Sequence, residues 1–141
     1  MRDEIRNIER ECLGGRVRKL NRMITAIYDR ALAESGVKTS QFSVLVAVAN
    51  RGTVQPAELT KILQIDESTI CRNVERMRAR GWLRLEDGED RRSHLIALTA
   101  AGEATIRKSL PGWRRAQEEV TRRLGGESVA ALRSAVSKLP R

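Results

Sequence analysis

Between residues 68 and 80 the sequence STICRNVERMRAR spaces polar and basic side chains along one face of a helix. At 100° per residue, Ile70, Val74 and Met77 share one side. The side chains that point away from them are Ser68, Thr69, Arg72 and Arg76. An arginine can donate two hydrogen bonds to guanine, and a threonine methyl can contact the thymine methyl. The pattern fits a helix that reads DNA bases, and a solvated face with Arg72, Arg76 and Arg80 at every fourth position is the alternative.

A second group of charged residues, DGEDRR, lies between two short segments of alternating polarity. Arg91 and Arg92 at a hairpin tip can enter a narrow minor groove, where the phosphates deepen the negative potential. Asp90 can hold one guanidinium in a fixed direction through a two-pronged ion pair. The alternative is an ordinary polar hairpin tip.

The elements that would position these residues follow from helix caps and stops. Leu59, Ile62 and Leu63 form a helical pattern after Pro56, which suits a first helical turn. Only Gln64, Ile65 and Asp66 separate it from the arginine-bearing helix, which Asp66 would cap and Gly81 would end. The segments WLRLE and SHLIALT then read as two antiparallel strands around Asp87-Gly88. This order predicts a winged helix-turn-helix.

Helical patterns also flank this unit on both sides. The N-terminal pattern runs from Ile5 to Ala31 and should break, or make a close helix contact, at Gly14-Gly15, since glycine is costly inside a helix. A helix capped by Thr39 or Ser40 should run to about residue 50, after Gly36 stops the first pattern. Thr99 should cap a long helix kinked at Pro111, and Gly125-Gly126 should separate it from a last helix.

The two terminal regions carry more apolar surface than a lone winged domain of this size can bury, which predicts pairing with a second copy. The expected division is residues 1–38 for an N-terminal dimerisation region, 39–99 for a DNA-binding winged domain, and 100–141 for C-terminal dimerisation helices. The fold class is therefore mainly α with a small β-wing.

Composition limits the class of protein. The chain has 141 residues and a formal net charge of +9, yet residues 66–100 carry seven basic and seven acidic side chains, so position matters more than total charge. No apolar run approaches the roughly 20 residues that a membrane span requires, so a cytoplasmic protein without membrane contact is expected. Cys12 and Cys71 lack the spacing of a metal site and are expected to be free thiols.

Catalytic and metal chemistry are not indicated. His94, the single histidine, stands in the second wing strand with no Cys or carboxylate cluster of metal-ligand spacing beside it. The sequence has no Gly-rich phosphate loop, no GxSxG and no HExxH motif. We expect no enzyme activity, no metal and no cofactor.

These motifs together are similar to those of the MarR family of winged helix-turn-helix transcriptional regulators, over about residues 10–140. The matching parts are the cap Asp66, Ser68, Thr69, the turn Arg80, Gly81, Trp82, Leu83, and the wing passage Asp90, Arg91, Arg92, Leu98, Thr99, Gly102. The resemblance implies a homodimer joined through its first and last helices. It further implies that Ser68, Thr69, Arg72 and Arg76 face the major groove of double-stranded DNA and that Arg92, steadied by Asp90, enters the minor groove. The operator would be pseudo-palindromic, with half-sites roughly 10 bp apart.

The resemblance also implies a repressor that responds to a small aromatic acid or phenol. Candidate lining residues are Met23, Ile27, Tyr28, Phe42 and Trp113, with an ordinary core role as the alternative, and Arg16 or Arg114 would pair with a carboxylate. A redox switch at Cys12 is a further alternative, although Thr39 stands where the peroxide-sensing branch has its second tyrosine. A redox switch at Cys71, beside the DNA-reading residues, is another alternative. The alternative function without DNA binding is a winged domain used for protein–protein assembly. Arg72, Arg76 and Arg92 distinguish the two, because an assembly domain would have no use for them.

Overall fold

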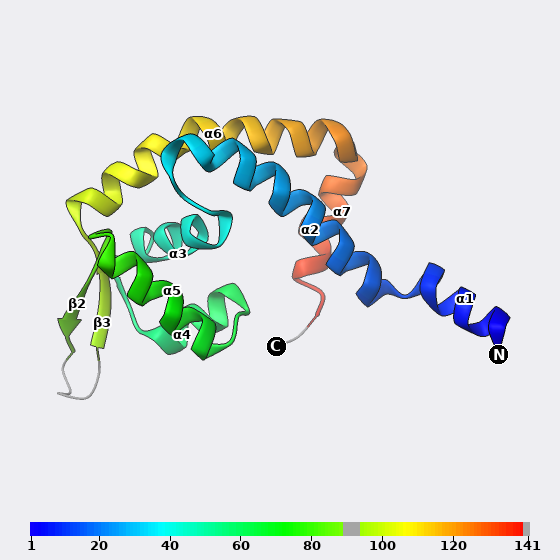
Figure 1. The fold of residues 1–141 in the computed structure, drawn as a ribbon, viewed down its shortest axis with the longest axis horizontal. Coiled ribbons are helices and arrows are strands. Elements are labelled where there is room, and N and C mark those ends of the chain that lie inside the picture. Colours follow the sequence, from blue (N-terminus) through cyan, green and yellow to red (C-terminus); the bar gives the residue numbers. More distant parts are fainter. Residues whose placement is uncertain (89–93, 140–141) are drawn as a thin grey trace.

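The structure is a computed structural model and describes residues 1–88 and 94–139. In these residues the chain is mainly helical with one small sheet (Figure 1), which confirms the predicted fold class. The helices are α1 (Arg2–Glu11), α2 (Leu13–Leu32), the 3-10 helix η1 (Ala33–Ser35), α3 (Thr39–Ala49), α4 (Pro56–Leu63), α5 (Glu67–Ala79), α6 (Ala100–Leu124) and α7 (Gly126–Val136). The strands are β1 (Thr53–Val54), β2 (Leu83–Asp87) and β3 (His94–Leu98).

The helix-turn-helix forms as the sequence predicts. Pro56 begins α4, and the three residues between α4 and α5 are those expected. Gln64 adopts a left-handed conformation with φ 53°, which turns the chain sharply enough for α5 to cross α4. Asp66 caps α5, and Gly81, with φ 74°, reverses the chain into β2.

The sheet has the order β1-β3-β2, and both pairings are antiparallel. The β2–β3 hairpin runs from the pair Leu83–Leu98 to the pair Asp87–His94. β1 is a two-residue strand that the sequence reading missed, because two residues show no period. It places the buried Val54 opposite Ile96, so β3 is held on both edges.

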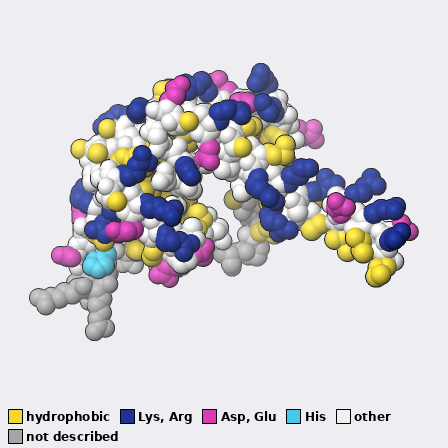
Figure 2. All heavy atoms as spheres, viewed as in Figure 1, with side chains coloured by type: hydrophobic (Ala, Val, Ile, Leu, Met, Phe, Trp, Pro, Cys, Tyr) yellow, Lys and Arg dark blue, Asp and Glu magenta, His cyan; other side chains and the backbone are white. Residues whose placement is uncertain are grey.

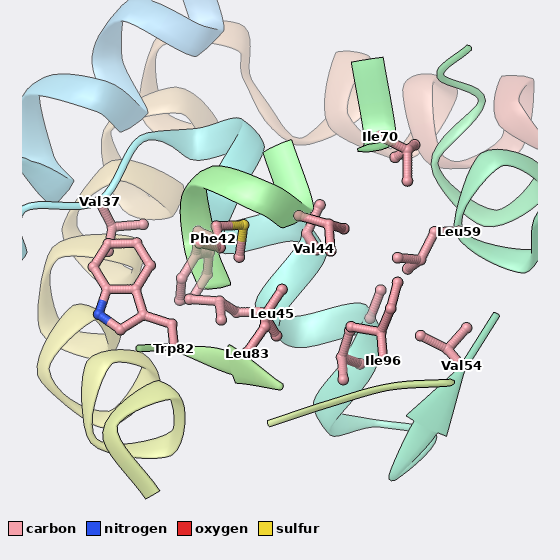
Figure 3. Packing of buried hydrophobic residues seen from close by; sticks show 14 of the residues in the cluster. Val37, Phe42, Val44, Leu45, Val54, Leu59, Ile70, Trp82, Leu83 and Ile96 are labelled. Carbon is pink, nitrogen blue, oxygen red and sulfur yellow. The ribbon is translucent and has the colours of Figure 1, made fainter. Parts of the chain in front are cut away.

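One hydrophobic core lies beneath α5. Leu59 of α4, Ile70 of α5 and Ile96 of β3 converge there and are fully buried (Figure 3). Leu45 of α3 and Met77 of α5 are also fully buried in the same cluster. Burying such side chains gains roughly 1.5–3 kcal/mol each, so the apolar side of α5 fixes which side faces outward.

The terminal helices differ in detail from the expectation. The first break falls at Cys12, whose ψ of 108° separates α1 from α2, and Gly14 and Gly15 both lie inside α2. The prediction of a break at the glycines was wrong by two residues. They occupy the first turn of α2, where backbone N–H groups have no partner within the helix. α6 continues through Pro111 without interruption.

α2 and α6 lie side by side and form an arm above the winged domain, while α1 extends away from it (Figure 1). No residue of α1 or α7 is buried, and the segments before and after the winged domain expose large apolar side chains. They are Met1, Ile5, Ile8, Leu13, Val17, Met23, Trp113, Leu132, Val136 and Leu139. Among the described residues, no helix is both long and apolar enough to cross a membrane.

Candidate nucleic-acid interface

The outer face of α5 presents the side chains that the sequence singled out. Ser68, Arg72 and Arg76 are exposed, and Thr69 is half-buried. The opposite face is closed by Ile70, Val74 and Met77, which are at most 7% exposed. The structure thus brings the four candidates together on one accessible face.

A network of hydrogen bonds organises the N-terminal end of this face. The Asp66 carboxylate accepts from the Ser68 hydroxyl at 2.6 Å, from the Thr69 hydroxyl at 2.7 Å and from the Thr69 backbone N–H at 2.9 Å. These donors, the Ser68 hydroxyl first, hold the pKa of Asp66 well below its ordinary value. Nη2 of Arg72 in turn donates to the Thr69 hydroxyl at 3.2 Å. Asp66 therefore orients Thr69, and Thr69 orients Arg72.

Arg80 does not share the outward direction of Arg72 and Arg76, although it has the same spacing in the sequence. Its guanidinium donates to the Gly36 carbonyl at 2.8 Å and lies over the Trp82 ring. Arg78 pairs with Glu75 at 2.9 Å on the flank of α5. Of the three arginines within α5, Arg72 and Arg76 are the two on the outward face.

The wing flanks α5 through β2. Asp90, Arg91 and Arg92, predicted to act in the minor groove, lie outside the described residues. At the base of the hairpin, Arg84 of β2 pairs with Glu86 at 2.6 Å and also donates to the Leu98 carbonyl. Sequence reasoning gave Arg84 no role, because one exposed arginine in a strand carries no distinguishing pattern.

Four of the five residues proposed to line one effector cleft divide between two pockets. Phe42 and Trp113 line a pocket of about 420 Å³ between α3, α4 and α6, together with Val46, Arg51, Ile62 and Leu63. Met23 and Ile27 line a second pocket of about 450 Å³ between α2 and α6, with Arg30 and Arg123 at its edge. The expectation of one shared cleft does not hold within a single chain.

Tyr28 lines neither of these pockets. Its hydroxyl donates to Oε1 of Gln117, and burial raises the pKa of Tyr28. Arg16, expected near a cleft mouth, pairs with Glu11 at 3.7 Å at the start of α2. The arginine that does line the first pocket is Arg51, which no pattern in the sequence singled out.

Both thiols and the histidine lie at the surface. Cys12 and Cys71 are free thiols and are exposed in the single chain. His94 is exposed at the start of β3. Within the part of the chain that the structure describes, no group of His, Cys, Asp and Glu could hold a metal ion.

Comparison with known proteins agrees with this architecture. Residues 35–93 match the model of the MarR family. The transcriptional repressor NicR of Pseudomonas putida is 34% identical over 124 residues, covering 86% of this chain and 78% of NicR. A mutant of Escherichia coli MarR, solved in complex with operator DNA, superposes with a TM-score of 0.85 at 26% identity, over 95% of this chain and 98% of the MarR chain.

A third similar protein is BpsR of Bordetella bronchiseptica, whose structure concerns the regulation of its DNA binding by 6-hydroxynicotinic acid. It superposes with a TM-score of 0.80 at 25% identity, over 91% of this chain and 93% of that chain. The two superpositions cover more than nine tenths of this chain, so both solved structures share its fold. On the sequence identity to NicR and the shared fold, the protein belongs to the MarR family.

Proposed function

We propose that the protein is a transcriptional regulator that binds a specific double-stranded DNA sequence as a homodimer. The observation that carries the proposal is the outward face of α5, where Ser68, Arg72 and Arg76 are accessible and Asp66 organises their neighbour Thr69. A helix of this kind fits the major groove with its N-terminal residues against base edges.

Each residue has a distinct role in this proposal. Arg72 and Arg76 donate paired hydrogen bonds to guanine, each contributing about 1–3 kcal/mol of base discrimination. Ser68 donates to the backbone or a base, and the Thr69 methyl contacts thymine. In the wing, Asp90 steadies Arg92 for the minor groove and Arg91 neutralises phosphate.

Dimerisation is supported by where the exposed apolar side chains lie. Ile5, Ile8 and Leu13 are 57–76% exposed, and apolar atoms line one edge of the projecting α1 (Figure 2). Val136 and Leu139 are more than 80% exposed near the other terminus. A second copy covers these surfaces, so regions 1–38 and 100–141 dimerise and region 39–99 binds DNA. Two-fold symmetry then requires a pseudo-palindromic operator with half-sites about 10 bp apart.

A small aromatic acid is the effector class that fits the first pocket. Phe42 and Trp113 supply aromatic surface there, and the Arg51 guanidinium can pair with a carboxylate. NicR is a repressor and BpsR responds to an aromatic acid, which favours repression relieved by a ligand. Because Trp113 is 37% exposed and Trp82 is 8% exposed, ligand binding should quench Trp113 emission, and a Trp113→Phe variant should lose the response.

The experiment for the main proposal is fluorescence anisotropy against DNA from upstream of the protein's own gene and against a shuffled sequence, at several salt concentrations. The proposal requires tight, salt-dependent binding to the first DNA only. The double variant Arg72→Ala, Arg76→Ala should lose this binding while keeping its thermal unfolding temperature. Arg107→Ala is the matched control, because it removes an exposed positive charge from α6, away from α5. Equal, weak binding of both DNAs by every variant would favour the protein–protein assembly alternative.

A further inference from the structure

The junction between the arm and the winged domain is short and sharply bent. α2 ends at Leu32, η1 follows, and Gly36 adopts a left-handed conformation with φ 71° before α3 begins at Thr39. Three helices make polar contacts with this junction. The contact from α6 is an exposed ion pair between Arg115 and Glu34 at 3.6 Å, and such pairs contribute little. The two hydrogen-bonded contacts come from α2 and from the end of α5.

The first contact is made by Asp29, in the last turn of α2. Its Oδ1 accepts from the Thr39 backbone N–H at 2.7 Å and from the Thr39 hydroxyl at 2.6 Å. Lys38 precedes α3 but has no side-chain oxygen to serve as a helix cap. Asp29 performs that function from the neighbouring helix, so the start of α3 is bound to the end of the arm.

The second contact is made by Arg80, at the C-terminal end of α5. Its Nη1 donates to the Gly36 carbonyl, 44 residues away in sequence, at 2.8 Å. Its guanidinium carbon also lies 4.1 Å from the centre of the Trp82 ring, a cation–π geometry that limits its rotation. The end of the DNA-reading helix is therefore bonded to the junction itself.

A second connection between arm and winged domain is α6. At its start Gly102 packs against the backbone of Trp82, and farther along Gly112 packs against the backbone of Ala31 in α2. Pro111 lies between these two points and cannot donate a backbone hydrogen bond, so α6 is weakest against bending there. Because α6 can bend, it does not fix the angle between the arm and the winged domain by itself. α6 and the hydrogen-bonded junction together do fix this angle.

We propose that Asp29 and Arg80 are positioning residues that fix the angle between the arm and the winged domain. This angle sets the separation of the two α5 helices in the dimer, and therefore which half-site spacing the protein accepts. The DNA consequence rests on the proposed function, because it needs a dimer that reads two half-sites. Neither residue needs to touch DNA in this role.

The test uses the variants Asp29→Ala, Arg80→Met and their combination. Met keeps the aliphatic cover over Trp82 but donates no hydrogen bond. Asp29→Asn and Arg80→Lys are the conservative variants, since an amide oxygen still accepts from Thr39 and an ammonium group still donates to Gly36. Arg78→Met is the matched control, because it removes the same charge from the same helix without changing the junction.

The first readout is affinity for the operator that the wild type selects from random DNA, compared with operators lengthened or shortened by one central base pair. The wild type should bind the altered operators at least about tenfold more weakly than the selected operator, because half-site spacing is a geometric property of the dimer. For the double variant this difference should be less than about threefold. The conservative variants should behave as the wild type. An unchanged spacing ratio overturns the proposal. A uniform loss at all spacings also overturns it, since that result indicates a phosphate contact or lost stability.

The second readout needs no DNA. In a Cys12→Ser background the exposed Cys71 on α5 accepts a spin label, and pulsed electron double resonance reports the distance between the two α5 helices of the free dimer. The double variant should broaden this distance distribution, and Arg78→Met should not. An equal width in the wild type and the double variant overturns the positioning role even if operator binding is intact. Failure of the wild type to select any operator overturns the proposed function instead, and the two failures are thereby distinguished.

Discussion

Gly112 of α6 lies directly against the backbone of Ala31 in α2, so that a Cβ built on Gly112 would overlap the Ala31 carbonyl oxygen. The two helices of the arm can approach this closely only because position 112 has no side chain. The same relation recurs at the start of α6, where a Cβ on Gly102 would overlap the Trp82 carbonyl oxygen. Glycine thus permits close backbone contact at two points along α6, once with the segment that precedes β2 and once with α2.

Gly112→Ala should destabilise the protein by about 1–3 kcal/mol, because backbone rather than a flexible side chain must move to admit the methyl group. Gly126→Ala is the control, since a Cβ at Gly126 meets no atom within 4 Å in the described structure. The free energy of unfolding from urea titration measures both. Equal stability of the two variants would contradict this account of the α2–α6 contact.

Arg72→Lys should remove base discrimination while largely keeping salt-dependent affinity. Lysine retains the charge but lacks the planar fork that pairs with guanine O6 and N7. The expected loss is about 1–3 kcal/mol against the operator and much less against shuffled DNA. Anisotropy titrations at several salt concentrations measure both quantities, with Arg107→Lys as the control. Equal losses on the two DNAs would assign Arg72 to phosphate contact.

Asp66→Asn should lower stability at neutral pH but not in acid. Because the pKa of Asp66 in the folded protein lies below its ordinary value of 3.8, the carboxylate stabilises the fold above about pH 3.8 and loses this effect as the pH falls further. The difference between wild type and variant in urea midpoint should therefore shrink between pH 5 and the acid limit. Glu67→Gln removes a charge from the same turn of α5 and is the comparison. A difference that stays constant with pH would refute the Asp66 network.

Val136→Asp should shift the dimer towards monomer without unfolding the winged domain. Val136 is 83% exposed in the single chain and contributes nothing to the core. In the proposed dimer the partner copy covers this side chain. Ser134→Asp introduces the same charge about 200° around α7 and should leave the dimer intact. Light scattering after size-exclusion chromatography gives the mass of each variant. A dimeric Val136→Asp protein would exclude this face of α7 from the interface.

The bounds and the outward face of α5 were predicted well from the sequence, because the signals that determine them are local. The turn at Gln64, the cap at Asp66 and the stop at Gly81 all act within a few residues of the backbone they shape. The outward set of Ser68, Arg72 and Arg76 followed from helix periodicity once Ile70 and Met77 were assigned to the core.

The features that the sequence did not predict depend on contacts between distant segments. Arg80 has the spacing of Arg72 and Arg76, and only its bond to Gly36 removes it from their row. Thr39 looked like a helix cap, whereas its hydroxyl and N–H both donate to Asp29. The effector candidates were grouped by helix, but α2 and α3 present them to different pockets, and Arg51 entered one of these through tertiary packing alone.

The lack of any buried residue in α1 has a consequence for how the protein responds to dilution. An isolated helix of 10 residues is marginal in water, so α1 owes most of its order to whatever covers its apolar edge. If that cover is the partner copy, coil-to-helix ordering of this segment is a bimolecular event that obeys mass action. Helicity would then rise with protein concentration along the same curve as dimer formation, and a cell with few copies would hold chains whose first segment is still unstructured.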